Sequence, residues 1–113
     1  MHPIKPGDRI EIIHDAVDEA ALAAARPERL GLGDEVQIVL CVAAFTAEKD
    51  HATLLRAWET VQKTTPTAQL VLAGDGPQLA LMRRQAEGLA RVTFLGWRDD
   101  VASLIKGADI VTL

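Results

Sequence analysis

The chain has 113 residues, 49% of them apolar, and a formal net charge of −4. This suits one small domain or part of one, and the acidic balance argues against nucleic acid or an anionic membrane as a partner. No apolar run approaches the ~20 residues that a membrane-spanning helix needs, and no secretory signal peptide is recognisable. We therefore expect a cytoplasmic protein without a membrane span.

The chain begins with a short strand and a helix. Apolar and polar side chains alternate at the start of residues 9–13, which predicts a strand. Residues 19–25 are rich in alanine and therefore favour a helix, with Asp18 as its cap. Asp15 and Asp18 could also act as a general acid and a general base, but turn and cap roles are favoured for them.

A long apolar run and the helix after it form the central part of the pattern. Residues 38–45 are apolar throughout, which is typical of a strand covered on both faces in a parallel sheet. Cys41 lies inside this strand, where a lone cysteine acts as a small buried hydrophobe and forms no intrachain disulfide. Asp50 is the expected N-cap of the helix. The apolar stripe of this helix contains Leu54, Leu55, Trp58 and Val61.

Two further strand–loop–helix units and a last strand complete the chain. Pro77 suits the first position of the second helix, because its missing N–H is not needed there. Asp99 or Asp100 is the expected cap of the third helix, which Gly107 ends. The remaining strands are expected over residues 69–73, 92–95 and 109–113.

Strands that alternate with helices predict a Rossmann-like α/β fold, in which a parallel sheet has right-handed crossovers and helices on both faces. Residues 1–34 would form the lead-in strand and helix, and residues 35–113 a βαβαβαβ core. The last strand has the pattern of an interior strand, and the chain stops within it. An open sheet edge is therefore expected, at which the chain would form a homodimer or swap a strand.

Three loops follow the carboxyl ends of the predicted strands, over residues 43–49, 74–77 and 96–99. They should meet at one rim, which is the usual ligand crevice of an open α/β sheet. Lys49 precedes a helix N-terminus, where a cation is disfavoured unless an anion binds there as well. The alternative is that Lys49 is an ordinary solvated lysine.

Two side chains on the third loop have more than one interpretation. Trp97 could stack on a base, close a domain interface or pack under its own loop. Arg98 could reach a phosphate, although exposure to water is the simpler interpretation. The histidines are scattered along the sequence and the single cysteine stands alone, so no metal-ligand cluster is expected.

Taken together, these motifs resemble the C-terminal half of the GT-B glycosyltransferases, in particular the retaining group often called family 4. The likeness covers nearly the whole chain. Each motif is weak alone, but the ordered set is fairly specific. The matching segments, in the family's order, are RIEIIHDAVD (9–18), VAAFTAEKDHATLLRA (42–57), PTAQLVLAGDGP (66–77), VTFLGWRDD (92–100) and ADIVTL (108–113).

The resemblance implies that the rim binds a nucleotide-diphosphate sugar. It implies that Lys49 neutralises the diphosphate, that the glycine turn lets backbone approach the ligand, and that the loop at Trp97 lies against the base through its main chain. The family generally works without a metal, so no cofactor is expected beside the donor. The donor-binding residues implied in this way are Ala43, Phe45, Lys49, Gly74, Asp75, Gly76, Trp97 and Arg98.

The chain also departs from the family pattern. Ala44 stands where many members have a second diphosphate-binding arginine, and residues 14–16 replace an Asn-Gly pair. The acceptor-binding domain would precede Met1, and the acidic motif for sugar and ribose would follow Leu113. The resemblance therefore implies no catalytic residue within this chain and no hexosyl transfer by the chain alone.

Two alternatives remain open beside a donor-binding part of a retaining glycosyltransferase. One is a fragment of a sugar-nucleotide epimerase with the same architecture, which would use carboxylates and histidines in the cleft. The rim has few of either. The other is a non-catalytic, excised module that serves only folding or assembly. Nucleotide binding that depends on Lys49 would separate a binding domain from such a module.

Overall fold

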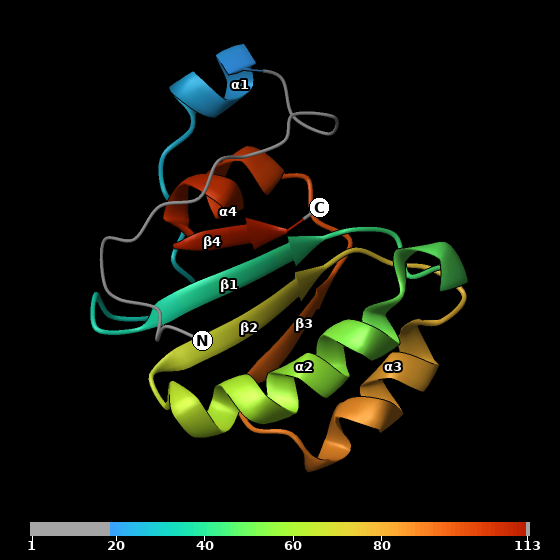
Figure 1. Ribbon diagram of the computed structural model, residues 1–113. Helices are drawn as coiled ribbons and strands as arrows, with labels where there is room; N and C mark the ends of the chain where they lie inside the picture. Colours follow the sequence, from blue (N-terminus) through green and yellow to red (C-terminus); the bar gives the residue numbers. More distant parts are fainter. Residues whose placement is uncertain (1–18, 113) are drawn as a thin grey trace.

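The computed structural model describes residues 19–112, which form a parallel four-stranded sheet with helices on both faces (Figure 1). The strand order is β3-β2-β1-β4, so β1 and β2 are the central strands. The predicted Rossmann-like α/β fold is confirmed. The strands are β1 (Gln37–Val42), β2 (Ala68–Ala73), β3 (Val92–Gly96) and β4 (Ile110–Thr112).

Helices α2 and α3 cover one face of the sheet, and α1 and α4 lie on the other (Figure 1). Two short 3-10 turns, η1 and η2, precede α2 and follow α3. The predicted strand over residues 9–13, Asp15 and Asp18 lie outside the described residues. The helical elements are α1 (Glu19–Ala24), η1 (Ala47–Lys49), α2 (His51–Thr64), α3 (Leu79–Gln85), η2 (Ala86–Gly88) and α4 (Val101–Gly107).

The sheet has two apolar cores because successive strand residues point to opposite faces. Leu55 and Trp58 of α2 and Met82 of α3 pack on one face, and all three are buried. The indole Nε1 of Trp58 also donates to the carbonyl of Ala90, at 2.8 Å. On the other face, Leu104 and Ile105 of α4 pack on Ile38, Leu40 and Val71. The predicted apolar stripe of α2 is thus confirmed, with its centre at Leu55 rather than Leu54.

Two predicted boundaries are wrong, for local reasons. Strand β1 ends at Val42, although the apolar run continues to Phe45. The side chain of Phe45 is fully buried, but it belongs to the loop after the strand. Helix α3 begins at Leu79, so Pro77 lies in a turn before the helix. This turn is closed by the Leu79 N–H, which donates to the carbonyl of Gly76 at 3.1 Å.

Strand β4 pairs with β1 over three residues, from Val39 opposite Ile110 to Cys41 opposite Thr112. It lies at the edge of the described sheet, so its outer side has no neighbour there. Unpaired edge groups can add another strand. The expected homodimer or strand swap through this edge stays a prediction.

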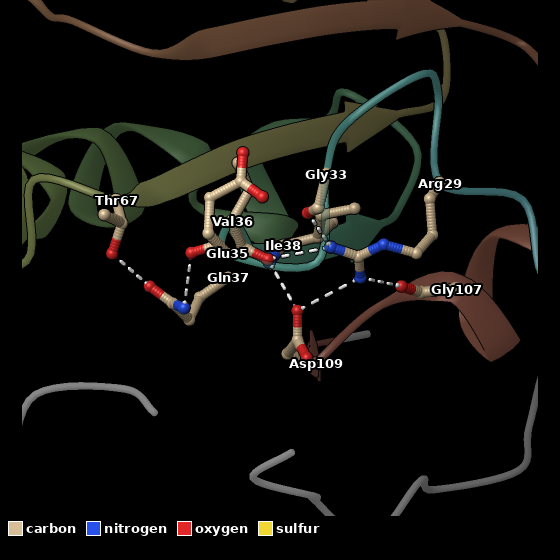
Figure 2. Close-up of polar contacts among 9 residues, drawn as sticks. All are labelled: Arg29, Gly33, Glu35, Val36, Gln37, Ile38, Thr67, Gly107 and Asp109. Carbon is tan, nitrogen blue, oxygen red and sulfur yellow. Dashed lines mark hydrogen bonds and ion pairs between the residues drawn. The ribbon is translucent and has the colours of Figure 1, made fainter. Parts of the chain in front are cut away.

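The amino end of the sheet is held by the side chain of Arg29 (Figure 2). Its Nη1 donates to the carbonyl of Gly107 at 2.8 Å and contacts the Asp109 carboxylate at 3.4 Å. Its Nη2 donates to the carbonyls of Gly33 and Val36, at 2.7 and 2.8 Å. One guanidinium therefore ties the segment before β1 to the end of α4 and the start of β4.

Asp109 completes this tie from the other side (Figure 2). Its Oδ2 accepts the backbone N–H of Ile38 at 2.8 Å, while its own N–H donates to the Ile38 carbonyl at 2.9 Å. The Arg29 and Asp109 side chains are 25% and 15% exposed, so both charges are largely removed from water. A carboxylate at this position sets β4 beside β1 and balances the charge of Arg29.

Candidate functional site

The loops that leave β1, β2 and β3 lie at one edge of the sheet, beyond the arrowheads of these strands in Figure 1. This is the carboxyl edge, where open α/β sheets bind ligands. We call them the rim loops. They cover residues 43–50, 74–78 and 96–100.

Backbone hydrogen bonds join the three rim loops, so the predicted convergence is confirmed. The Phe45 N–H donates to the carbonyl of Asp75 at 3.0 Å, and the Gln78 N–H donates to the carbonyl of Phe45 at 3.0 Å. The Gly74 N–H donates to the carbonyl of Gly96 at 2.7 Å. The second loop is therefore the bridge between the other two.

The glycines of the second loop are required by this close packing. Gly74 and Gly76 have φ values of +144° and +155°, which side chains rarely adopt. A Cβ on Gly74 would collide with the carbonyl oxygen of Ala43, and one on Gly76 would lie 2.6 Å from the Phe45 oxygen. The close approach that the turn permits is thus made to the first loop. The Gly76 N–H is also engaged, because it donates to the Asp75 carboxylate at 2.7 Å.

Lys49 is the last residue of η1, and its side chain is exposed. Within residues 19–112 its ammonium has no ion-pair partner. Asp50, with φ of +51°, separates it from α2 and caps that helix, as predicted. The Asp50 carboxylate accepts the Thr53 N–H at 3.3 Å and the Thr53 hydroxyl at 2.7 Å. These two bonds lower the pKa of Asp50.

This arrangement changes the interpretation of the lysine. The N-terminus of α2 already has an anion of its own in Asp50, and Lys49 lies at the carboxyl end of a helical turn, where a cation is favoured. The helix dipole therefore does not single out Lys49 as misplaced. What distinguishes it is an unpaired charge on a loop that is fixed to the second rim loop through Phe45.

Phe45 and His51 form a pair of stacked rings beneath the first rim loop. Their ring centres are 3.9 Å apart and their planes differ by 12°. Phe45 is 0% exposed and His51 is 4% exposed. Neither ring nitrogen of His51 has a hydrogen-bond partner within the described residues. Burial lowers the pKa of His51, while the nearby Asp50 partly opposes this shift.

The remaining predicted site residues differ in what they can offer a ligand. Ala43 is half-buried at the end of β1, and Phe45 can contribute only main chain, because its ring is covered. Asp75 is exposed, but its carboxylate would repel a phosphate. Sequence reasoning missed His51, because three isolated histidines carry no signal until the fold places one of them against Phe45.

The third rim loop presents an indole and an ion pair. Trp97 is 73% exposed, which excludes packing under its own loop. Stacking on a base and closing a domain interface stay predictions. Arg98 is held by Asp100 through two bonds, from Nε to Oδ1 at 2.8 Å and from Nη2 to Oδ2 at 2.7 Å. These bonds lower the pKa of Asp100 and raise that of Arg98. The Asp100 side chain makes no hydrogen bond to α4, although it occupies the predicted cap position.

Other kinds of site are not seen in the described part of the chain. No three histidine, cysteine, aspartate or glutamate side chains lie together there as metal ligands. Burial raises the pKa of Cys41 to about 11, so this thiol is not poised as a nucleophile. None of the helices over residues 19–112 is long and apolar enough to span a membrane.

Comparison with known proteins assigns the chain to a family. Residues 36–113 match the family of group 1 glycosyl transferases. The chain is similar to the N-acetyl-alpha-D-glucosaminyl L-malate synthase of Bacillus anthracis, with 26% identity over 97% of the chain and 30% of that protein. It is also similar to a GDP-mannose-dependent alpha-(1-6)-phosphatidylinositol monomannoside mannosyltransferase of Mycolicibacterium smegmatis, with 35% identity over 66% of the chain and 19% of that protein.

Among solved structures, the chain is similar to Anabaena Alr3699/HepE, crystallised in complex with UDP and glucose. The TM-score is 0.62 and the identity 21%, over 84% of this chain and 27% of that one. This likeness shows a shared fold. The chain thus spans less than a third of the length of each of these relatives. The family match covers more than half of the chain, which therefore belongs to the group 1 glycosyltransferases and has the Rossmann-like fold of one GT-B domain.

Proposed function

We propose that this chain is the donor-binding part of a retaining, metal-independent glycosyltransferase, and that its rim loops bind a nucleotide-diphosphate sugar. The observation that carries the proposal is the position of Lys49. It is an exposed, unpaired cation on a loop that backbone hydrogen bonds fix to the second rim loop at the carboxyl edge of the sheet. An acceptor-binding domain would supply the rest of the active site, so the chain alone would bind a donor without transferring the sugar.

The diphosphate is the part of the donor that Lys49 would contact. When the bond to the sugar breaks, the departing diphosphate gains negative charge. A cation that is already fixed beside it stabilises this state more than the intact donor. The tie through Phe45 holds the loop backbone before the ligand arrives, so less order has to be created on binding.

The nucleotide base would lie against the third rim loop. The indole of Trp97 offers an exposed aromatic face, and stacking accepts any base. Arg98 would contribute its main chain, because its guanidinium is already paired with Asp100. The matched relatives differ in this respect, since one is described with UDP and another as dependent on GDP-mannose. The base is therefore the variable to determine first.

The test is a calorimetric titration of the chain with UDP, GDP and ADP, repeated on two lysine variants. Lys49→Ala should weaken binding by about 5- to 150-fold, the equivalent of about 1–3 kcal/mol for a charge-assisted contact. Lys63→Ala is the matched control, because Lys63 is an exposed lysine at the opposite end of α2. It should leave the affinity unchanged. Quenching of Trp97 fluorescence gives a second readout, with the buried Trp58 as internal reference.

Two results would contradict the proposal. Equal affinity of Lys49→Ala and the parent chain would remove Lys49 from the site. A folded chain that binds none of the three nucleotides, either alone or as part of a longer chain with the rest of the family domain, would favour the alternative of an assembly module. The epimerase alternative has less support, since the histidine that residues 19–112 place near the rim is buried and cannot reach a substrate.

A further inference from the structure

Two stacked aromatic rings hold the two ends of the first rim loop together. Phe45 precedes the loop segment 46–50 and His51 follows it, and the two rings stack at 3.9 Å. The backbone of Phe45 is fixed to the second rim loop on both sides, through its N–H and its carbonyl. His51 begins α2. The ring stack therefore joins the rigid helix to the rigid loop and holds the intervening turn, which contains Lys49.

The stack requires an uncharged imidazole. His51 is 96% buried, given its exposed fraction of 4%, and neither of its nitrogens has a hydrogen-bond partner within the described residues. A protonated ring would need acceptors for two N–H groups and would place a charge where water is excluded. We propose that the neutral ring of His51 positions the Lys49 loop for the diphosphate, and that a proton on this ring opens the stack and releases the loop. This inference rests on the proposed function.

The charged side chains near the stack are two anions and two cations. On the same segment are Glu48, Lys49 and Asp50, and Arg56 follows in α2. Of these four, Asp50 is the one whose charge attracts a proton to the ring. Its carboxylate already accepts two hydrogen bonds from Thr53.

The neighbouring elements add a further positive charge. On β3, Phe94 lies 6.0 Å from the Phe45 ring and carries no charge. On α3, the guanidinium of Arg83 lies 5.7 Å from the centre of the Phe94 ring. Gln85 of α3 is neutral and donates to the Ala52 carbonyl of α2 at 3.2 Å. Burial, and not these charges, is what lowers the pKa of His51 in the closed loop.

The direction of the pH effect follows from the pKa of His51, which differs between the closed loop and the open loop. The pKa of His51 lies below its ordinary value of 6.5 in the closed loop and returns toward that value when the ring reaches water. Above 6.5 both forms are neutral and closure is not affected. Below 6.5 the open form takes a proton first, so the open fraction rises about tenfold per pH unit until the lowered pKa is reached.

The experiment compares the 113-residue chain with the variant His51→Phe, which keeps a flat ring but cannot be protonated. UDP affinity is measured for both at pH 7.5 and 5.5. UDP loses charge itself near pH 6, as phosphate groups do, and this affects both proteins equally. We expect similar affinities at pH 7.5. At pH 5.5 the parent should bind more weakly than the variant, by up to about tenfold, because only its loop opens.

A second measurement separates this inference from the proposed function. Amide exchange at Lys49 and Asp50, whose N–H groups donate to Thr46 and Ala47 within the loop, reports loop opening without any ligand. Acid should accelerate this exchange in the parent but not in His51→Phe, after correction for intrinsic rates. The inference would be overturned if acid changed amide exchange equally in the parent and in His51→Phe, and if the ratio of their UDP affinities did not change with pH. If neither protein binds UDP, GDP or ADP at any pH, the proposed function fails, and amide exchange alone decides whether the ring releases the loop.

The parent chain also provides a test that needs no variant, in case His51→Phe does not fold. The ring signals of His51 can be followed by NMR through the same pH range. Loop exchange that accelerates over the pH range in which these signals shift supports the inference. Exchange that accelerates at a different pH, or does not accelerate at all, contradicts it.

Discussion

The two ends of the sheet are held together in different ways. At the amino end, side chains add to the backbone bonds, since Arg29 contacts four oxygens and Asp109 accepts from both Arg29 and Ile38. At the carboxyl end, the backbone makes the ties, through the bonds that join Phe45 and Gly74 to the neighbouring loops. Arg29 and Asp109 at the amino end are therefore paired with each other, whereas Lys49 at the carboxyl end has no ion-pair partner within the described residues and is available to a ligand.

This difference separates stability from binding within one small chain. A charge whose terminal nitrogens are bonded within the protein, as in Arg29, contributes to the folded state and has little left for a ligand, although the buried Nε of Arg29 has no partner within the described residues. A loop held by its backbone leaves its side chains available, and Lys49 and Trp97 are both exposed at that edge. Variants at the two ends should accordingly affect different measurements.

The largest effect is expected at the amino end, from Asp109→Ala. This change leaves the Ile38 N–H and the partly buried Arg29 charge without their carboxylate. We expect the free energy of unfolding to fall by about 3 kcal/mol, measured by urea denaturation. Asp99→Ala is the control, because Asp99 is an exposed aspartate on the third rim loop. A loss for Asp109→Ala no larger than that of the control would show that the side-chain tie does not hold this end.

An intermediate effect is expected at the carboxyl end, from Gly76→Ala. The new Cβ would lie 2.6 Å from the Phe45 oxygen, and φ of +155° strains any side chain. Stability should fall by about 2 kcal/mol, and UDP affinity should fall with it, since the first two rim loops separate. Gly88→Ala is the matched control, because a Cβ at Gly88 meets nothing within 4 Å. Unchanged UDP affinity in Gly76→Ala would mean that the backbone tie does not support the site.

The order of the elements could be predicted because it depends on local patterns. The strand runs, the cap at Asp50 and the end of α4 at Gly107 follow from short stretches of sequence, and the structure agrees. The end of β1 could not be predicted in this way. Phe45 continues the apolar run, but its burial serves the ring stack with His51 and not the strand.

The contacts that define the two ends depend on residues far apart in the sequence. Arg29 and Asp109 are separated by 80 positions, and nothing near either residue indicates the other. The rim was predicted from strand ends alone, whereas the pairing of Arg98 with Asp100 required side-chain geometry. His51 and Phe45 are close in sequence, but only the conformation of the loop between them brings the rings face to face.

The smallest effect is expected from Asp100→Ala, and it tests whether occupied charges are unavailable for binding. Arg98 is the one rim-loop arginine, and Asp100 neutralises it through two bonds. Removing the carboxylate should free the guanidinium, which would then attract the diphosphate across partly exposed surface. Such pairs contribute little, so UDP affinity should rise by about two- to fivefold in low salt, and less in high salt. The double variant Asp100→Ala/Arg98→Ala should lose the gain. A single Arg98→Ala variant that weakens binding as strongly as Lys49→Ala would contradict this account, because it would show that Arg98 reaches the donor despite Asp100.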